Sequence, residues 1–317
     1  MRTTIDKVGG VFASSDLLSD VVDRGHRRYR CWAHDFDSRA IILATKIGDH
    51  WEAEVKKQWE ENKERILQQL RYEFGEANHA QKMQNFIDIG PKPFSIVTYH
   101  NALFDQARSA FVIGAYYPAL TGASALGERI LNHLVLDLRD CYRATPEYKH
   151  VYRKKSFVDW QLAIDTLTAW GVLLPETASE FTKLQPLRHR SLHFSPDTYP
   201  NLRDDALAAI IHIREIVGSQ FSAFGIQPWF IVGTPGACFI KRHYENHPFI
   251  HRYFLPQSPF VGVHNGIEFD DRGRVRFIDF HDYGDGELTD EEYRDAFNHR
   301  DLNSIARSTV KTDQPAK

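Results

Sequence analysis

The sequence has little cysteine, and none of it stands in a pattern in which cysteine normally acts. Its 317 residues include 3 cysteines, Cys31, Cys141 and Cys238, which lie far apart and form no CxxC spacing. That arrangement argues against a disulfide framework and a zinc knuckle, and it fits a reducing cytoplasm. We therefore expect a cytoplasmic protein.

Long hydrophobic runs and the common nucleotide-binding motifs are also missing. No segment reaches the roughly 18 uninterrupted apolar residues of a membrane span, and residues 1–11 lack the apolar core of a signal peptide. The chain contains no GxxxxGK[ST] loop, no GxGxxG after a predicted strand and no GxSxG elbow. The sequence thus gives no support for a membrane protein, a nucleotide hydrolase, a dinucleotide oxidoreductase or a serine hydrolase, and we expect no cofactor.

Neither sign of charge dominates the chain. Lysine and arginine number 39 against 42 aspartates and glutamates, for a net charge of −3 and a pI near 6.6. This balance argues against a broad basic face that coats nucleic acid, although a local basic site remains compatible with it. A hydrophobic content of 42% is ample for a core, and the length predicts two or three packed units.

Apolar residues recur at helical spacing through the first two thirds of the chain. A long amphipathic helix is predicted at 41–74, and Pro91 and Pro93 predict a boundary because proline lacks the donor N–H. Further helices are predicted at 95–117, 119–141, 156–170, 176–193 and 204–224. We expect the first two of these to pair as an antiparallel hairpin within a helical bundle.

The pattern changes after residue 224. Segments 229–233, 261–263 and 274–278 are short, rich in β-formers and separated by turn residues, and Thr289 with Glu292 predicts a helix capping box. The predicted fold class is mainly α, with a central antiparallel bundle, an N-terminal long helix and a small C-terminal α+β region. The predicted segments are 1–92 (N-terminal, mainly helical), 93–224 (bundle), 225–307 (α+β) and 308–317 (a flexible tail).

Arg188 and His193 form an Arg-x4-His pair near the end of the helix predicted at 176–193. Imidazole exchanges protons near neutral pH, whereas guanidinium stays charged and can donate to two phosphate oxygens. RNA cleavage needs groups of these two types, although the spacing alone does not establish that activity. Our hypothesis gives His193 the role of general acid and base and Arg188 that of stabilising the phosphate, with Arg190 as a second phosphate contact. Three other pairs share the spacing but lie outside the predicted bundle: Arg242/His247, Arg276/His281 and Arg294/His299.

Helix geometry constrains this pair. Five positions correspond to about 140° around the axis of a straight helix, so the two side chains meet only at a bend or a helix end. Pro196 predicts such an end just past His193, and Pro186 can perturb the earlier part of the helix.

The hairpin sequences at 107–111 and 122–128, together with Arg188 to His193, resemble the HEPN domain family (higher eukaryotes and prokaryotes nucleotide-binding). The resemblance covers about 130 of the 317 residues. It implies a metal-independent endoribonuclease that leaves 2′,3′-cyclic phosphate and 5′-hydroxyl ends. It also implies a homodimer with both motifs in one cleft, and a toxin or phage-defence setting with a regulatory or antitoxin partner. The position after the arginine, often Asn in that family, is His189 here.

Plainer interpretations remain open for each of these residues. Arg188 and Arg190 can be solvated residues of a helix end that His193 caps, and Glu128 can orient His193, assist with His189 in the site, or simply form a surface ion pair. The domain can also be a catalytically inactive dimerisation or nucleotide- or RNA-sensing module.

A metal site is the remaining alternative. Its candidate ligands would be His243, His247, His251, Asp279, His281 and Asp282. Pro248 interrupts the helix that would align the first three histidines, so we expect no metal.

Overall fold

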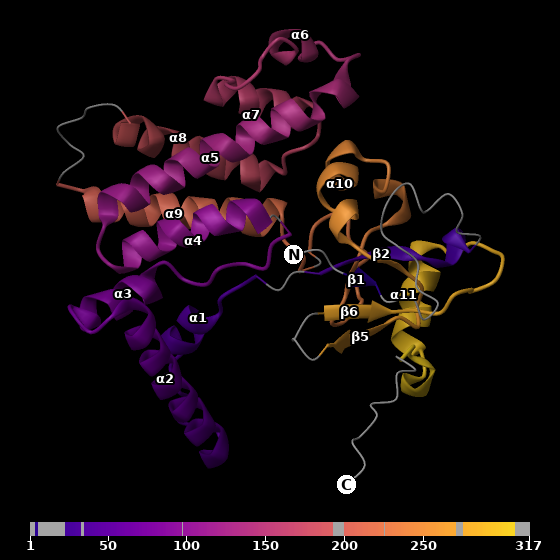
Figure 1. Cartoon of the computed structure of the whole chain (residues 1–317), viewed down its shortest axis with the longest axis horizontal. Coiled ribbons are helices and arrows are strands. Elements are labelled where there is room, and N and C mark those ends of the chain that lie inside the picture. Colours follow the sequence, from indigo (N-terminus) through magenta and orange to yellow (C-terminus); the bar gives the residue numbers. More distant parts are fainter. Residues whose placement is uncertain are drawn as a thin grey trace. The chain divides into compact units, whose positions relative to one another are not determined.

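The computed structural model describes residues 4–5, 23–32, 35–96, 98–192, 200–224, 226–270 and 275–307, and it is mainly helical (Figure 1). The chain divides into two units, one formed by residues 1–33 together with 223–317 and the other by residues 34–222. In the described ranges, no helix combines the length and the apolar character needed to cross a membrane.

Helices alone build the unit of residues 34–222 within its described part. Their bounds are α1 (Arg39–Ala44), α2 (Ala53–Phe74), α3 (His79–Asp88), α4 (Thr98–Val112), α5 (Tyr116–Leu138), η3 (Arg139–Tyr142), α6 (Tyr148–Val151), α7 (Trp160–Ala169), α8 (Pro175–Leu192) and α9 (Leu202–Gln220). α5 packs against α4, α7, α8 and α9, which lie around it in Figure 1. Its predicted apolar stripe, Leu126, Ile130, Leu134 and Leu138, is buried.

α4 and α5 form the predicted antiparallel hairpin. Gly114 joins them with φ of +86°, a left-handed conformation that favours glycine. His100 contacts His133, whereas a Cβ placed on Gly122 would lie 3.6 Å from the Cβ of Ala107. Later residues of α4 therefore meet earlier residues of α5, as two antiparallel helices require.

The predicted helix at 41–74 is wrong in one respect, because it is two helices. α1 ends at Ala44 and α2 begins at Ala53. The intervening loop turns at Gly48, where a Cβ would lie 2.8 Å from the His50 ring, and it places Trp51 edge-on against Trp59 of α2 at 5.4 Å. The apolar Trp51 thus covers α2 from the loop instead of extending the helix.

Residues 34–92 belong to the same unit as the bundle, so the predicted segment boundary at residue 92 lies inside it. Lys92 is buried and its ammonium group pairs with Asp105 at 2.6 Å and with Asp35 at 2.5 Å. Its backbone also bonds to that of Asp37. The prolines beside Lys92 follow α3, but they do not separate residues 34–92 from the bundle.

Strands and short helices build the other unit. Their bounds are β1 (Thr4–Ile5), η2 (Arg24–His26), β2 (Arg28–Cys31), β3 (Cys238–Phe239), η5 (Arg242–Tyr244), α10 (Pro248–Tyr253), η6 (Leu255–Gln257), β4 (Phe260–Val261), β5 (Gly266–Phe269), β6 (Val275–Ile278), α11 (Asp290–His299) and η7 (Leu302–Ser304). The described strands form two sheets, in the orders β1-β6-β5 and β3-β2-β4. β1 pairs with β6 in parallel and the other pairs are antiparallel. Strands from the start of the chain therefore complete sheets made by its end.

Of the strands predicted in this unit, two are found at least in part and one is wrong. β6 confirms the predicted strand at 274–278, and β4 covers the start of the one at 261–263. The strand predicted at 229–233 is wrong: Phe230 forms an isolated bridge with Ile240, and Gly233 turns the chain with φ of +85°. The capping box is confirmed, since the Glu292 amide donates to the Thr289 hydroxyl at 3.1 Å and the Thr289 amide donates to the Glu292 carboxylate at 2.8 Å.

Candidate functional site at the end of α8

Three of the predicted site residues, Arg188, His189 and Arg190, lie at the last turn of α8, and a fourth, Glu128, lies on α5. The helix runs through Pro186 without a break and ends at Leu192. His193 lies outside the described residues, so its ring is not placed.

Arg188 is held by Glu128 of α5. Its Nε and Nη2 atoms donate to the same Glu128 oxygen, Oε2, at 3.1 and 3.0 Å, and both side chains are 22% exposed. Nη1 of Arg188 and Oε1 of Glu128 have no hydrogen-bond partner in the part of the chain that the structure describes. The carboxylate therefore fixes one edge of the guanidinium and leaves another N–H group available to an anion.

Arg190 pairs with a residue that the sequence did not single out. Its Nε and Nη2 atoms donate to the two oxygens of Asp205 in α9, at 3.2 and 2.7 Å, in a fork-to-fork arrangement. Asp205 belongs to the first turn of α9, where a carboxylate is favourable beside the helix dipole. The end of α8 is thus tied to α9 as well as to α5.

Tyr117 borders the same turn. Its hydroxyl donates to the backbone carbonyl of Ser191 at 3.2 Å, while the Ser191 hydroxyl donates to the carbonyl of Arg188 at 3.0 Å. The bond from Tyr117 satisfies a carbonyl of the last helical turn, where a helix end leaves carbonyl groups without intrahelical donors. Tyr117 is 52% exposed, so part of an aromatic side chain lies at the surface beside the last turn of α8. His189 follows Arg188 on α8 and is exposed.

The bundle also contains a histidine pair that sequence reasoning missed. Nε2 of His100 in α4 lies 3.2 Å from Nδ1 of His133 in α5, and the two rings are stacked. Burial, and after it the charges of His133 and Arg129, lowers the pKa of His100 to about 4. No local pattern could reveal this pair, because 33 positions separate the residues.

The metal alternative finds no support within the described ranges, where no three His, Cys, Asp or Glu side chains are placed to hold an ion. His243 lies in η5, and His251 lies in α10, which begins only at Pro248. Asp279 accepts bonds from Arg27 and from the Gly262 amide. The nearby aromatic residues Phe249, Phe254 and Phe260 are core residues.

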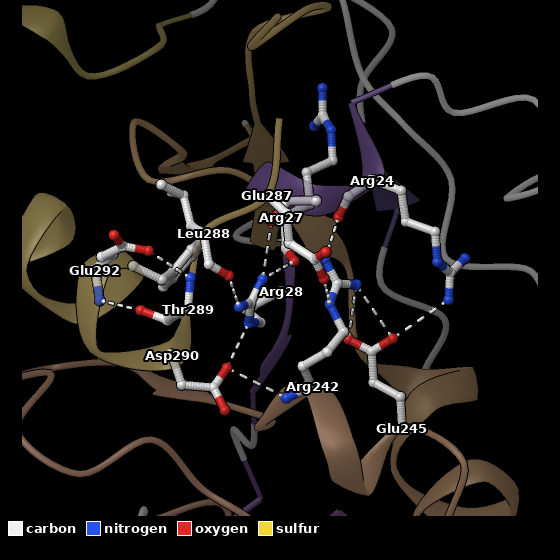
Figure 2. Close-up of polar contacts among 12 residues, drawn as sticks. Arg24, Arg27, Arg28, Arg242, Glu245, Glu287, Leu288, Thr289, Asp290 and Glu292 are labelled. Atoms are coloured by element: carbon white, nitrogen blue, oxygen red, sulfur yellow. Dashed lines mark hydrogen bonds and ion pairs between the residues drawn. The ribbon is translucent and has the colours of Figure 1, made fainter. Parts of the chain in front are cut away.

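A second concentration of charged side chains lies in the unit formed by residues 1–33 and 223–317 (Figure 2). Arg28 is fully buried, and it donates to the Asp290 carboxylate at 2.7 Å and to the Leu288 carbonyl at 2.5 Å. Asp290 also accepts from the backbone amide of Arg242 at 3.2 Å. These bonds fasten β2 and η5 to the first turn of α11.

Glu245 is the second acceptor in this cluster (Figure 2). It is buried, and Arg24 and Arg242 both reach its carboxylate at 3.3 Å. Burial raises the pKa of Glu245, and the three nearby arginines, Arg242, Arg24 and Arg28, act against that rise. In this ion-pair network, three arginines share the two carboxylates of Glu245 and Asp290.

Comparisons with known proteins add nothing to the geometry. The chain matches no protein-family model, no curated protein and no solved structure.

Proposed function

We propose that this protein is a metal-independent endoribonuclease of HEPN type, acting in a toxin or phage-defence setting. The observation that carries the proposal is the Arg188 guanidinium. Glu128 holds its Nε and Nη2 edge, while Nη1 has no protein acceptor among the described residues. An arginine oriented in this way can donate to a phosphate without giving up its carboxylate partner.

The proposed reaction needs one phosphate-binding group and one group that exchanges protons. The RNA 2′-oxygen attacks the adjacent phosphorus and loses its proton to the His193 imidazole, while the bond from phosphorus to the 5′-oxygen breaks. A proton from an imidazolium reaches the leaving 5′-oxygen. The products are a 2′,3′-cyclic phosphate and a 5′-hydroxyl. Arg188 stabilises the charge that develops on the phosphate, and Arg190 lies two residues further along the same helix end.

A homodimer would complete the site. Ile113 and Tyr117, at the turn from α4 to α5, are 54% and 52% exposed, and Tyr117 bonds to the last turn of α8. Exposed apolar side chains beside a site are typical of surfaces that pack against another protein. In the proposed dimer, each protomer contributes its Arg188 and His193 to one shared cleft, where the paired motifs gather positive charge around RNA.

One observation favours a second candidate. Arg188 and Arg190 both have carboxylate partners, Glu128 and Asp205, as expected for a bundle whose arginines only hold helices together. The same domain would then be a catalytically inactive dimerisation module, or one that senses nucleotides or RNA, because a fold does not guarantee a working site.

RNA cleavage by purified variants distinguishes the two candidates. Wild-type chain, Arg188→Gln and His193→Ala are incubated with cellular RNA in EDTA, and new ends are sequenced with a method sensitive to cyclic phosphates. We expect each substitution to lower cleavage by roughly 10²-fold or more. The matched control is His299→Ala, which removes an exposed histidine from the Arg294/His299 pair of the same spacing.

The control chain should cleave like the wild type. Cleavage by His193→Ala at the wild-type rate would overturn the proposed mechanism. Intact RNA in every sample, from protein that is folded and dimeric, would favour the sensing module.

A further inference from the structure

A segment beyond the end of α5 carries exposed positive charge that no acidic side chain balances. Residues 148–157, which cover α6 and the loop that leads to α7, contain no aspartate or glutamate. Their lysines and arginines are all exposed: Lys149, Arg153, Lys154 and Lys155. None of these side chains pairs with a carboxylate in the part of the chain that the structure describes, whereas Arg143, just before the segment, pairs with Asp140 at 3.1 Å. In a chain with a net charge of −3, the segment is therefore a local basic surface.

Aromatic rings lie among these cations. The rings of Tyr148 and Tyr152 are 5.8 Å apart, and the guanidinium carbon of Arg153 lies 5.1 Å from the centre of the Tyr152 ring. Tyr152 is 42% exposed and Phe157 is 50% exposed. An exposed ring beside a cation can stack on another planar group while it keeps its charged neighbour.

Internal contacts fasten the backbone of this segment to the bundle. Val151 is fully buried, and Arg139 at the end of α5 donates to the carbonyl groups of Val151 and Lys154. Next to the other end of the segment, the Val158 amide donates to the side chain of Asn132 in α5 at 2.7 Å. The exposed cations and rings are thus presented on a backbone that α5 holds, where α6 lies at the end of the bundle (Figure 1).

We infer that residues 148–157 form a binding surface for single-stranded RNA. Lysine and arginine side chains attract the phosphates, and exposed rings stack on unpaired bases of any sequence. An acidic peptide would use the cations but not the ring faces, and a lipid surface needs a longer apolar face than two rings supply. The bases of a duplex already stack on one another, so a single strand fits this surface better.

One RNA strand can span the distance from this surface to Arg188. From Glu128, which holds Arg188, to Arg139 at its end, α5 rises by about 17 Å at roughly 1.5 Å per residue. A strand with the roughly 3.4 Å spacing of stacked bases covers this distance in about five nucleotides. The surface would then hold the RNA while it is cleaved at Arg188, a role that rests on the proposed function.

Fluorescence anisotropy of the full chain with a labelled 2′-O-methyl RNA measures binding without cleavage. The probe has no free 2′-hydroxyl and cannot react in the proposed way, so its Kd does not depend on whether the protein is a ribonuclease. We expect saturable binding of the single-stranded probe, and binding at least about fivefold weaker for the same sequence in a duplex. Binding to vesicles that contain phosphatidylserine, in place of the RNA, would contradict the inference.

Paired charge variants assign the binding to this surface. Lys154→Gln/Lys155→Gln should raise the Kd and lower the slope of log Kd against log salt by about 1.4, since each phosphate contact with a single strand contributes roughly 0.7. Lys57→Gln/Arg65→Gln is the matched control, because it removes two exposed charges from α2 in the same unit. The control should change neither the Kd nor the slope.

Tyrosine variants test the stacking. Tyr152→Ala should raise the Kd about fivefold or more with little change in the salt slope, whereas Tyr72→Ala, which removes a 94% exposed tyrosine of α2, should leave the Kd unchanged. The inference is wrong if the wild-type chain does not bind the single-stranded probe, or if the variants of α2 weaken binding as much as those of residues 148–157. Binding of the probe by a chain that cleaves no RNA would instead contradict the proposed function and confirm the surface.

Discussion

Nη1 of Arg27 donates to Oδ2 of Asp279 at 2.6 Å across 252 positions of sequence. Both side chains are buried, and Arg27 also meets Asp23 through two further bonds of 2.8 and 2.7 Å. Asp279 follows β6 and Arg27 precedes β2, so this contact joins an N-terminal strand to the C-terminal part of the same unit. The fold of the unit therefore depends on a charged contact in its interior.

Removing this contact should be far more costly than removing Arg30, which pairs with no carboxylate among the described residues. Arg27→Met is expected to destabilise the unit by about 3–5 kcal/mol, because it leaves two carboxylates buried without a cation. Arg30→Met leaves only the Asn265 amide oxygen without its donor and should cost about 0–2 kcal/mol. Hydrogen exchange of the β2 amides measures both losses within this unit. Equal losses would mean that Arg30 has a counter-charge after all.

The contrast between these arginines explains which parts of the structure the sequence could predict. The stripe of Leu126, Ile130, Leu134 and Leu138 is local, so its spacing alone placed α5 and its buried face. β2 escaped prediction because its arginines suggest an exposed segment, whereas Arg27, Arg28 and Arg30 are all buried. Their burial depends on partners such as Asp279 and Asp290, more than 250 positions away.

At the candidate site, too, the sequence could not predict which side chains pair. The sequence singled out Arg188 and Glu128, but it expected Glu128 to orient His193 or to pair at the surface, and the structure pairs it with Arg188 over 60 positions. Asp205, the partner of Arg190, was not foreseen, because aspartate in the first turn of a helix is common and carries no functional signal. Residue types could thus be recognised locally, whereas their pairing required the packing of α5, α8 and α9.

Lowering the pH should destabilise the bundle, because protonation of the His100 imidazole is disfavoured in the folded state. The pKa of this buried imidazole is lowered from 6.5 to about 4, so the folded state favours its neutral form. The stabilisation from this shift is present above pH 6.5 and is lost as the pH falls towards 4. The expected loss is about 3 kcal/mol, since each pKa unit corresponds to about 1.4 kcal/mol.

Stability of α4 and α5 amides measured between pH 7 and pH 4 checks this expectation. His100→Leu should flatten the pH dependence, whereas His150→Ala should leave it intact, because His150 is exposed. The interpretation fails if His100→Leu keeps the full loss on acidification.

Two glycines of α5 should respond to alanine in opposite directions. A Cβ on Gly127 would lie 2.5 Å from Leu184 of α8 and 3.0 Å from Trp160 of α7, so Gly127→Ala should cost about 1–3 kcal/mol by overpacking. A Cβ on Gly122 would meet Ala107 at an ordinary 3.6 Å, and Gly122→Ala should stabilise the helix by about 0.5–1 kcal/mol. Hydrogen exchange of the α5 amides measures both the expected loss and the expected gain in stability. A stabilising Gly127→Ala would show that α7 and α8 do not approach α5 this closely.

The pairing of Arg188 with Glu128 should matter little for stability and much for cleavage. Because both side chains are 22% exposed, a double-mutant cycle of Arg188→Gln and Glu128→Gln should give a stability coupling of about 1 kcal/mol or less. RNA cleavage should nevertheless fall roughly tenfold in Glu128→Gln, whose arginine remains but is no longer held, and roughly 10²-fold or more in Arg188→Gln. Arg143→Gln, which removes an exposed ion pair with Asp140 in the same unit, is the comparison. If cleavage in these variants merely tracked their loss of stability, the arginine would be a structural residue, and the sensing module would be the better account of the domain.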